Sequence, residues 1–264
     1  MNFDSHLITT IFFAFLGGVL PALIWLFFWI QEDRANPEPK SMIALAFIGG
    51  MVAVFVSLFL EKYLYGLGLK NIFDFSIFTI FEPIFENVAS QTSIAIDKVL
   101  LVVVFAPFIE EISKFVLAYL LVLRSDTNDE PLDPMIYLIT VALGFAAVEN
   151  MLFLINPYYN SSNLILTIFT ENMRFVGSTI LHTVSSATIA IFMSLHFFDG
   201  KIKRIFYIVI GVSFSILMHG IFNLLMIGSQ TASIFALELI WVIVIIILLA
   251  FEKIKDIRRE RIVN

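Results

Sequence analysis

Ionisable side chains lie deep inside several long apolar stretches of this sequence. A charged group at the centre of a membrane helix costs several kcal/mol, and such groups usually face a cavity or a partner. These groups are Glu110, Glu111 and Lys114 in the stretch 98–123, Glu149 in 135–155, His182 in 175–198 and His219 in 205–225. The pattern therefore predicts an internal polar site with a chemical task.

Carboxylates and imidazoles in one apolar site can hydrolyse a peptide bond in two ways. A desolvated glutamate can take a proton from the attacking water, while an imidazole or an asparagine amide stabilises the oxyanion. Alternatively, His182, His219 and Glu149 bind zinc, and Glu110 or Glu111 is the base. Spacing does not decide between them, and the sequence names no cofactor. The chain has no cysteine, which excludes thiol catalysis and thiolate metal sites.

The two adjacent glutamates must have different roles, because two neighbouring carboxylates in a low dielectric do not both stay charged cheaply. Lys114 is four residues after Glu110 and three after Glu111. Acid-first spacing of four is the better ion-pair geometry. We therefore expect Glu110 to pair with Lys114 and Glu111 to act as the base.

The elements that hold these residues are predicted to be membrane-spanning helices. The chain has 264 residues, 59% hydrophobic and only 14% charged, whereas soluble domains carry roughly 25% charged residues. A bilayer core needs about 20 apolar residues in a helix. Seven stretches qualify: 7–30, 41–60, 98–123, 135–155, 175–198, 205–225 and 231–251. We expect an all-α, polytopic membrane protein forming one domain over 1–264, with no basic face for nucleic acid.

Alternating helix directions bring the polar residues to overlapping depths. At about 1.5 Å rise per residue, Glu110 lies roughly 18 Å from the outer end of its helix, and Glu149, His182 and His219 lie about 9–10 Å from theirs. We therefore expect these side chains to line one cavity.

Basic residues in the loops predict the orientation, because cytoplasmic loops are enriched in Lys and Arg. Lys62 and Lys70 fall on one side. The opposite side holds eleven: Arg34, Lys40, Arg124, Lys201, Lys203, Arg204, Lys253, Lys255, Arg258, Arg259 and Arg261. We expect an extracytoplasmic N-terminus and a cytoplasmic C-terminus. The long connection 61–97 carries an apolar stripe at helical spacing, which predicts a helix on the outer membrane surface or a lid over the site.

The motifs resemble those of the PrsW family of intramembrane proteases, relatives of the CAAX prenyl proteases. The resemblance runs from about residue 31 to 225, and Asp33-Arg34-Ala35-Asn36-Pro37-Glu38-Pro39 resembles the family's first cytoplasmic loop. The ordered motifs are Glu110-Glu111-x-x-Lys114, Phe145-x-x-x-Glu149-Asn150, Arg174 with His182 and Ser186, and His219-x-x-x-Asn223.

The resemblance implies a plasma-membrane protease that cuts a membrane-protein substrate, such as an anti-sigma factor. It also assigns Lys114, Asn150, Arg174, Ser186 and Asn223 as residues that support the site. The alternative function is a proton- or cation-coupled transporter, or a scaffold, because buried carboxylates and histidines also form ion pathways. No pair of broken helices indicates the inverted repeat of many transporters, so the motifs favour the protease.

Overall fold

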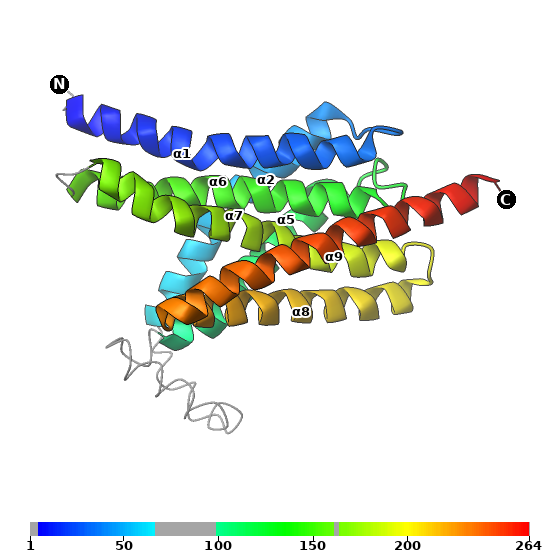
Figure 1. The fold of residues 1–264 in the computed structure, drawn as a ribbon. Coiled ribbons are helices and arrows are strands. Elements are labelled where there is room, and N and C mark those ends of the chain that lie inside the picture. Colours follow the sequence, from blue (N-terminus) through cyan, green and yellow to red (C-terminus); the bar gives the residue numbers. More distant parts are fainter. Residues whose placement is uncertain (1–4, 67–98, 161–163, 264) are drawn as a thin grey trace.

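Seven helices form the part of the chain that this computed structural model describes, residues 5–66, 99–160 and 164–263. Figure 1 shows them packed side by side as one bundle. They are α1 (Ser5–Ile30), α2 (Lys40–Gly66), α5 (Ala106–Ala118), α6 (Asp133–Asn160), α7 (Leu164–Leu195), α8 (Lys201–Ile227) and α9 (Gln230–Val263). No strand occurs among the described residues. The predicted all-α, polytopic fold is confirmed.

Six of the helices are long and apolar enough to cross a membrane, and α5 is the exception at 13 residues. Its span is nevertheless continuous, because π-helical turns at Leu101–Phe105 and Tyr119–Leu123 extend it at both ends. Pro107 lacks a backbone N–H and stands just after the first π turn, where Ala106 N–H bonds to Leu101 O. Wider turns of this kind are common at functional sites, and this one leads into the Glu110-Glu111 pair.

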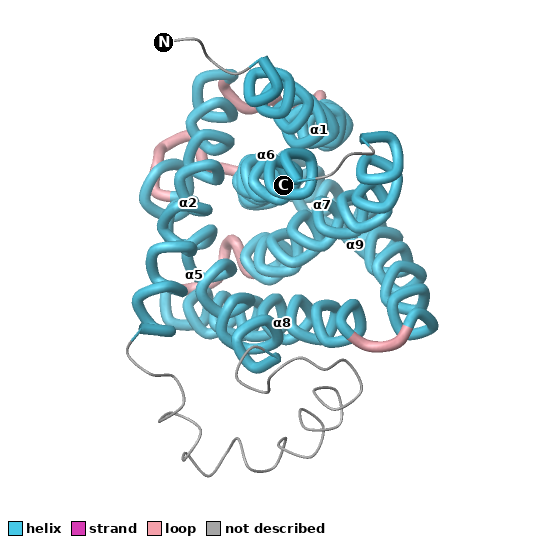
Figure 2. Tube along the Cα trace, turned by 90° about the vertical axis from the view of Figure 1, so that its left-hand side faces the viewer, coloured by secondary structure: helices cyan, strands magenta, loops and turns pink. Residues whose placement is uncertain are grey.

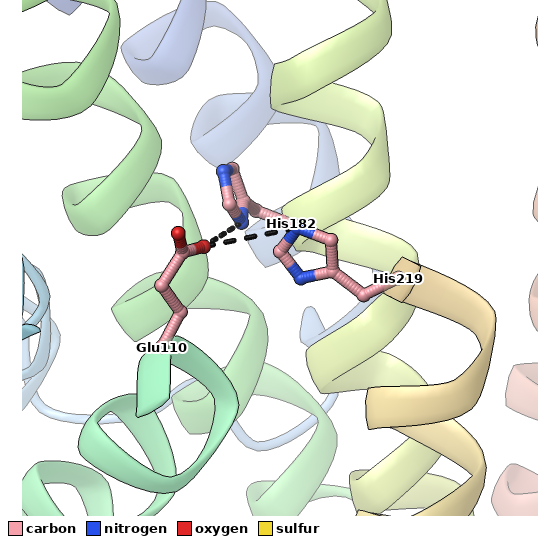
Figure 3. Close-up of side chains that lie close together, drawn as sticks. All are labelled: Glu110, His182 and His219. Atoms are coloured by element: carbon pink, nitrogen blue, oxygen red, sulfur yellow. Dashed lines mark ion pairs between the residues drawn. The ribbon is translucent and has the colours of Figure 1, made fainter. Parts of the chain in front are cut away.

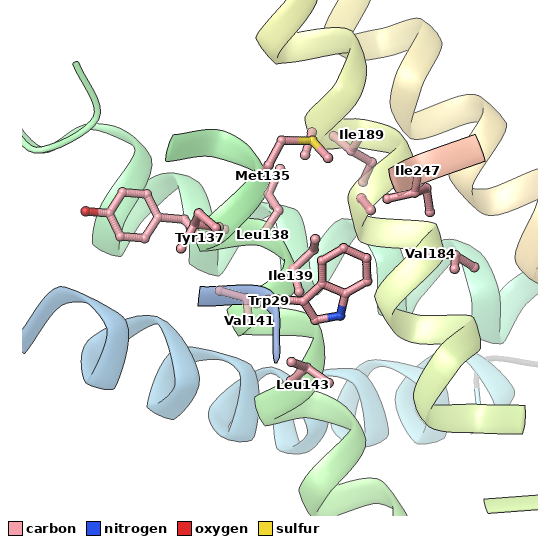
Figure 4. Close-up of a cluster of buried hydrophobic side chains, with 14 of the residues drawn as sticks. Trp29, Met135, Tyr137, Leu138, Ile139, Val141, Leu143, Val184, Ile189 and Ile247 are labelled. Carbon is pink, nitrogen blue, oxygen red and sulfur yellow. The ribbon is translucent and has the colours of Figure 1, made fainter. Parts of the chain in front are cut away.

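Helix α6 is the centre of the bundle and packs against α1, α2 and α7 (Figure 2). Every residue from 131 to 148 is buried. Leu138 and Ile139 of α6 belong to one apolar cluster with Trp29 of α1 and Val184 of α7 (Figure 4). Large side chains such as Phe27, Phe59 and Leu249 instead point outward and are about two-thirds exposed. An apolar exterior fits a lipid bilayer.

Glycines allow α2 and α6 to approach closely. A Cβ atom added at Gly50 would lie 1.9 Å from Val141 O, and one added at Gly144 would lie 2.0 Å from Phe47 O. Small residues at membrane helix crossings permit such backbone contact. The crossing fixes α2 beside the helix that carries Glu149.

The basic connections lie at one end of the bundle. The α1–α2, α5–α6 and α7–α8 connections end on the same side as the C-terminus (Figure 1). This arrangement agrees with an odd number of spans, and which side faces the cytoplasm stays a prediction. The apolar stripe predicted within 61–97 lies almost wholly in 67–98, outside the described residues.

Candidate active site

A cavity of about 590 Å³ opens between α2, α5, α6, α7 and α8. Its lining includes one ionisable residue from each of these helices: Glu61, Glu110, Glu149, His182 and His219. Asn150 and Asn223 also line it, and most of the remaining wall is apolar. The structure thus brings four of the five residues expected to be catalytic to a single cavity.

One ring nitrogen of His182 in α7 is hydrogen-bonded to a carboxylate. Its Nε2 lies 2.6 Å from Glu149 Oε2, which also accepts a hydrogen bond of 3.1 Å from Ser178 Oγ. A carboxylate at this distance requires a proton on Nε2, so the lone pair of a neutral ring is on Nδ1. That Nδ1 lies 3.2 Å from Lys114 Nζ and 4.0 Å from Glu110 Oε2.

His219 of α8 repeats the arrangement with the ring reversed. Its Nδ1 lies 2.7 Å from Glu111 Oε1, so the proton is on Nδ1 and the lone pair of a neutral ring is on Nε2. Nε2 faces Glu110 Oε2 at 3.7 Å. The two imidazoles stand nearly perpendicular, with centroids 5.2 Å apart. Each histidine is therefore oriented by a carboxylate and turns its other ring nitrogen towards Glu110, and the nitrogen of His182 also lies at hydrogen-bond distance from Lys114 Nζ.

One carboxylate oxygen of Glu110 faces both imidazole rings, as Figure 3 shows. One ligand atom each of Glu110, His182 and His219 lies within 4.8 Å of the others. Glu110 Oε2 is buried and receives no hydrogen bond. Three electron-pair donors facing one another repel unless a proton or a cation lies between them. A histidine whose second nitrogen is bound to a carboxylate is the common arrangement in protein metal sites, so these residues fit a metal ion.

The pairing of the adjacent glutamates is the reverse of the expectation from sequence. Lys114 Nζ donates to Glu111 Oε1 at 2.7 Å, and both side chains are fully buried. Glu111 Oε2 also accepts a hydrogen bond of 3.1 Å from Ser215 Oγ. The expected Glu110–Lys114 pair is wrong, because Glu110 points into the cavity and only Glu111 faces the lysine. The ion pair is therefore formed between residues three apart, Glu111 and Lys114.

The three residues that lie close enough to share a metal ion differ in one member from the zinc ligands expected from sequence, His182, His219 and Glu149. Glu149 contacts the protonated Nε2 of His182, whereas the nitrogen that could bind a metal is Nδ1, on the other side of the ring. Glu110 takes the place of Glu149 beside the two histidines. Glu149 remains at the cavity wall with 20% of its side chain exposed.

The supporting residues divide into three groups. Asn150 and Asn223 line the cavity, where Asn150 Nδ2 donates to Thr179 Oγ1 at 2.9 Å and Asn223 Nδ2 donates to Val102 O at 3.0 Å. Ser186 is buried away from the cavity, and its hydroxyl has no hydrogen-bond partner. The side chain of Arg174 lies outside the described residues.

Sequence reasoning missed three residues of the site. Ser178 and Ser215 each precede a site histidine by four residues, and that helical spacing is a signal for both. Glu61 of α2 lines the cavity. In the sequence it directly follows the uncharged stretch 41–60, so it resembles a residue at the end of a membrane span. Nothing in the local sequence separates it from an ordinary solvent-facing glutamate.

Comparisons with known proteins show that this chain is similar to one group of enzymes. Residues 38–251 match the model of a family described as PrsW family intramembrane metalloprotease. A protein named Protease PrsW from Clostridioides difficile is 30% identical over 234 residues, covering 88% of this chain and 86% of that protein. Its namesake from Geobacillus kaustophilus is 25% identical over 232 residues, covering 85% and 86%. No solved structure matches this chain.

Proposed function

Because this chain belongs to the PrsW family of intramembrane metalloproteases, we propose that it hydrolyses a peptide bond of a membrane protein at the Glu110–His182–His219 cluster. The observation that carries the proposal is the convergence of three electron-pair donors within 4.8 Å at the wall of one cavity. A packing role does not explain why both imidazoles turn the nitrogen that is not bound to a carboxylate towards Glu110, whose Oε2 receives no hydrogen bond from the described residues.

Glu110, His182 and His219 are the residues that would hold the metal ion. Such an ion lowers the pKa of bound water and polarises a carbonyl group. A carboxylate at hydrogen-bond distance restrains each histidine, so the cluster is preorganised. Glu149 fixes the His182 ring, and Glu111 fixes the His219 ring. Lys114 offsets the charge of Glu111 in a fully buried position.

Glu149 is the carboxylate that we assign as proton acceptor for the attacking water. Its side chain is partly exposed at the cavity wall, whereas that of Glu111 is not exposed at all. The proton would then pass from Glu149 to the leaving amine, as general acid–base catalysis requires. Asn223 lines the same cavity, and the N–H of its amide that does not bond to Val102 O would donate to the developing oxyanion.

A metal-free mechanism is the second candidate, and one contact favours it. Lys114 Nζ lies 3.2 Å from His182 Nδ1, so the ammonium group can donate to the lone pair that a metal would need. In that mechanism Glu110 takes the proton of the water and returns it to the leaving amine, and the Asn223 amide stabilises the oxyanion. His219 Nε2 would take that second role only with a proton on both ring nitrogens. Both candidates place Glu110 at the reacting atoms.

The substrate that we propose is a membrane protein with a helical span, for which an anti-sigma factor is the example implied by the family. An apolar cavity wall suits a substrate that comes from the bilayer. The proposed location is the plasma membrane, with the N-terminus outside and the C-terminus in the cytoplasm.

Purified protein in liposomes tests the proposal. The substrate is a single-span membrane peptide with a fluorophore and a quencher on opposite sides of the span, and ion flux is followed in the same vesicles. We expect cleavage by the wild-type chain, none by Glu110→Gln, and wild-type cleavage by the His196→Ala control. Ion flux without cleavage of any peptide in a panel would favour the transporter and overturn the protease.

A further inference from the structure

A second group of carboxylates lies at the end of the bundle near the C-terminus, away from the cavity. Asp33 ends the short 3₁₀ turn after α1, Glu38 lies in the loop before α2, and Asp133 begins α6. One oxygen of each lies within 4.8 Å of the others. None of the three lines the candidate active site.

Asp133 is the most constrained member of the cluster. It is fully buried, and its Oδ2 accepts hydrogen bonds from the backbone N–H groups of Asp129 and Glu130, at 2.8 and 2.6 Å. Its other oxygen, Oδ1, is buried as well and receives no hydrogen bond from any N–H or O–H group in the described part of the chain. A buried carboxylate oxygen without a donor is costly to maintain.

Among the side chains that the structure describes, none is a cation that offsets the charge of Glu38 or Asp133. Among the described residues, no lysine or arginine nitrogen lies within 4.0 Å of either carboxylate. Tyr137 OH donates to Glu38 Oε2, which supplies a single neutral donor. Carboxylates in a buried group repel one another unless an external charge compensates them.

We propose that Asp33, Glu38 and Asp133 bind a hard divalent cation, Mg²⁺ or Ca²⁺. All the available donors are oxygens, which suit these ions, whereas a site selective for zinc would include nitrogen or sulfur. Three carboxylates fill only part of the coordination shell of either ion, and water completes it. The cation accounts for both the unpaired Oδ1 of Asp133 and the uncompensated charge of Glu38 and Asp133.

The cation joins two connections of the bundle. Asp33 and Glu38 bracket the α1–α2 loop, and Asp133 fixes the start of α6. Asn36 Nδ2 donates to Glu130 Oε1 at 2.5 Å, so the same two segments already meet at a neighbouring point. Because α6 carries Glu149, the site stabilises the helix that bears part of the active site without touching the reaction.

Thermal unfolding of the full chain in detergent tests this site. After treatment with EDTA, MgCl₂ or CaCl₂ is titrated into the wild type, Glu38→Gln and Asp133→Asn. We expect a saturable rise in Tm of about 5–10 °C for the wild type at a concentration roughly 100-fold above Kd. We expect no rise for either variant. Whichever salt acts at the lower concentration identifies the ion.

Two controls make the result specific. Asp126→Asn removes an exposed carboxylate of the α5–α6 loop outside the cluster and should keep the full rise. Glu110→Gln removes a carboxylate of the other cluster and should also keep it. An equal rise in the wild type and both site variants would overturn the proposal. The proposal would also be overturned if neither salt raised the Tm and both site variants were more stable than the wild type. In that case a proton shared between Glu38 and Asp133 would take the place of the cation.

Discussion

Glu110→Gln and Glu111→Gln form a matched pair that separates catalysis from stability. The two substitutions are isosteric and adjacent, but the carboxylates have different surroundings. Glu110 Oε2 receives no hydrogen bond from the described residues and faces His219 Nε2 at 3.7 Å and His182 Nδ1 at 4.0 Å. Glu111 accepts from Lys114 and Ser215 and lies 2.7 Å from His219 Nδ1.

Glu110→Gln should abolish activity without unfolding the protein. As a metal ligand or as a base, Glu110 acts on the reacting atoms, and loss of a general base lowers the rate about 10²–10⁴-fold. In the metal-free protein, the removal of an unpaired buried charge leaves the Tm unchanged or raises it. The Tm is therefore compared in the presence of a chelator.

Glu111→Gln should instead destabilise the protein, because it leaves Lys114 as an uncompensated buried charge. Removing one member of a buried ion pair costs about 3–5 kcal/mol. The amide can still accept a hydrogen bond from His219, so we expect the lower end, which corresponds to a fall in Tm of roughly 6–12 °C. Its residual activity should be measured well below that temperature.

The assays are peptide cleavage in liposomes and thermal unfolding in detergent, both on the same preparations. The reasoning is refuted if Glu110→Gln retains full cleavage, or if Glu111→Gln loses cleavage with an unchanged Tm. That second result would restore Glu111 as the base, the assignment that the sequence alone suggests.

Three further predictions concern packing, substrate binding and pH. Gly50→Ala should lower the Tm strongly, since its Cβ would lie 1.9 Å from a backbone carbonyl oxygen of α6, whereas Gly200→Ala meets nothing within 4 Å and should have little effect on packing. Glu61→Gln should change KM more than kcat for the reporter peptide, because Glu61 lines the cavity but is not one of the carboxylates paired with His182 or His219 among the described residues; a loss confined to kcat would refute this. The hydrogen bond from His196, with Lys203 nearby, holds the pKa of Asp199 below its ordinary value of 3.8. A lowered carboxyl pKa stabilises the fold above pH 3.8 and the effect disappears as pH falls through the folded-state value. Asp199→Asn should therefore lower the Tm slightly at pH 7 and have no effect at the acid end of a pH series.

The helices were predictable because each is a long stretch with few charges, which only a helix can place in a bilayer. Their ends were less predictable. Helix α7 begins at Leu164 rather than 175, and α9 continues to Val263 rather than 251. Polar residues end a span but do not end a helix, and neither extension contains the glycine or proline that would stop it.

The residues that line the site could be predicted from their depth in the helices, whereas the glutamate that pairs with Lys114 could not. Counting residues from the helix ends places Glu110, Glu149, His182 and His219 at similar depths, and helix packing brings them to one cavity. Which glutamate faces Lys114 depends on the rotation of α5 by about 100° per residue. Glu110, Glu111 and Lys114 all lie within the regular helix Ala106–Ala118, so both spacings allow an ion pair. Contacts outside α5 decide between them, because Glu111 meets Ser215 and His219 of α8 whereas Glu110 lines the cavity.

The carboxylate cluster at the other end shows a different limit. The segment Asp33–Pro39 attracts notice in the sequence, but Asp133 is almost a hundred residues later and looks like an ordinary first residue of a helix. Only the packing of α1 and α2 against α6 brings the three together. Contacts between distant loops are set by the whole bundle and have no local signature.

The most direct test of the central claim is the zinc content of the purified chain. The protein is isolated in detergent, and bound transition metal per chain is measured together with cleavage, for the wild type, Glu110→Gln, His182→Ala, His219→Ala and the control His196→Ala. We predict about one ion per chain in the wild type and in the control, and loss of both metal and cleavage in the three site variants. A wild-type chain that is fully active with no bound metal would contradict the metal centre at Glu110, His182 and His219.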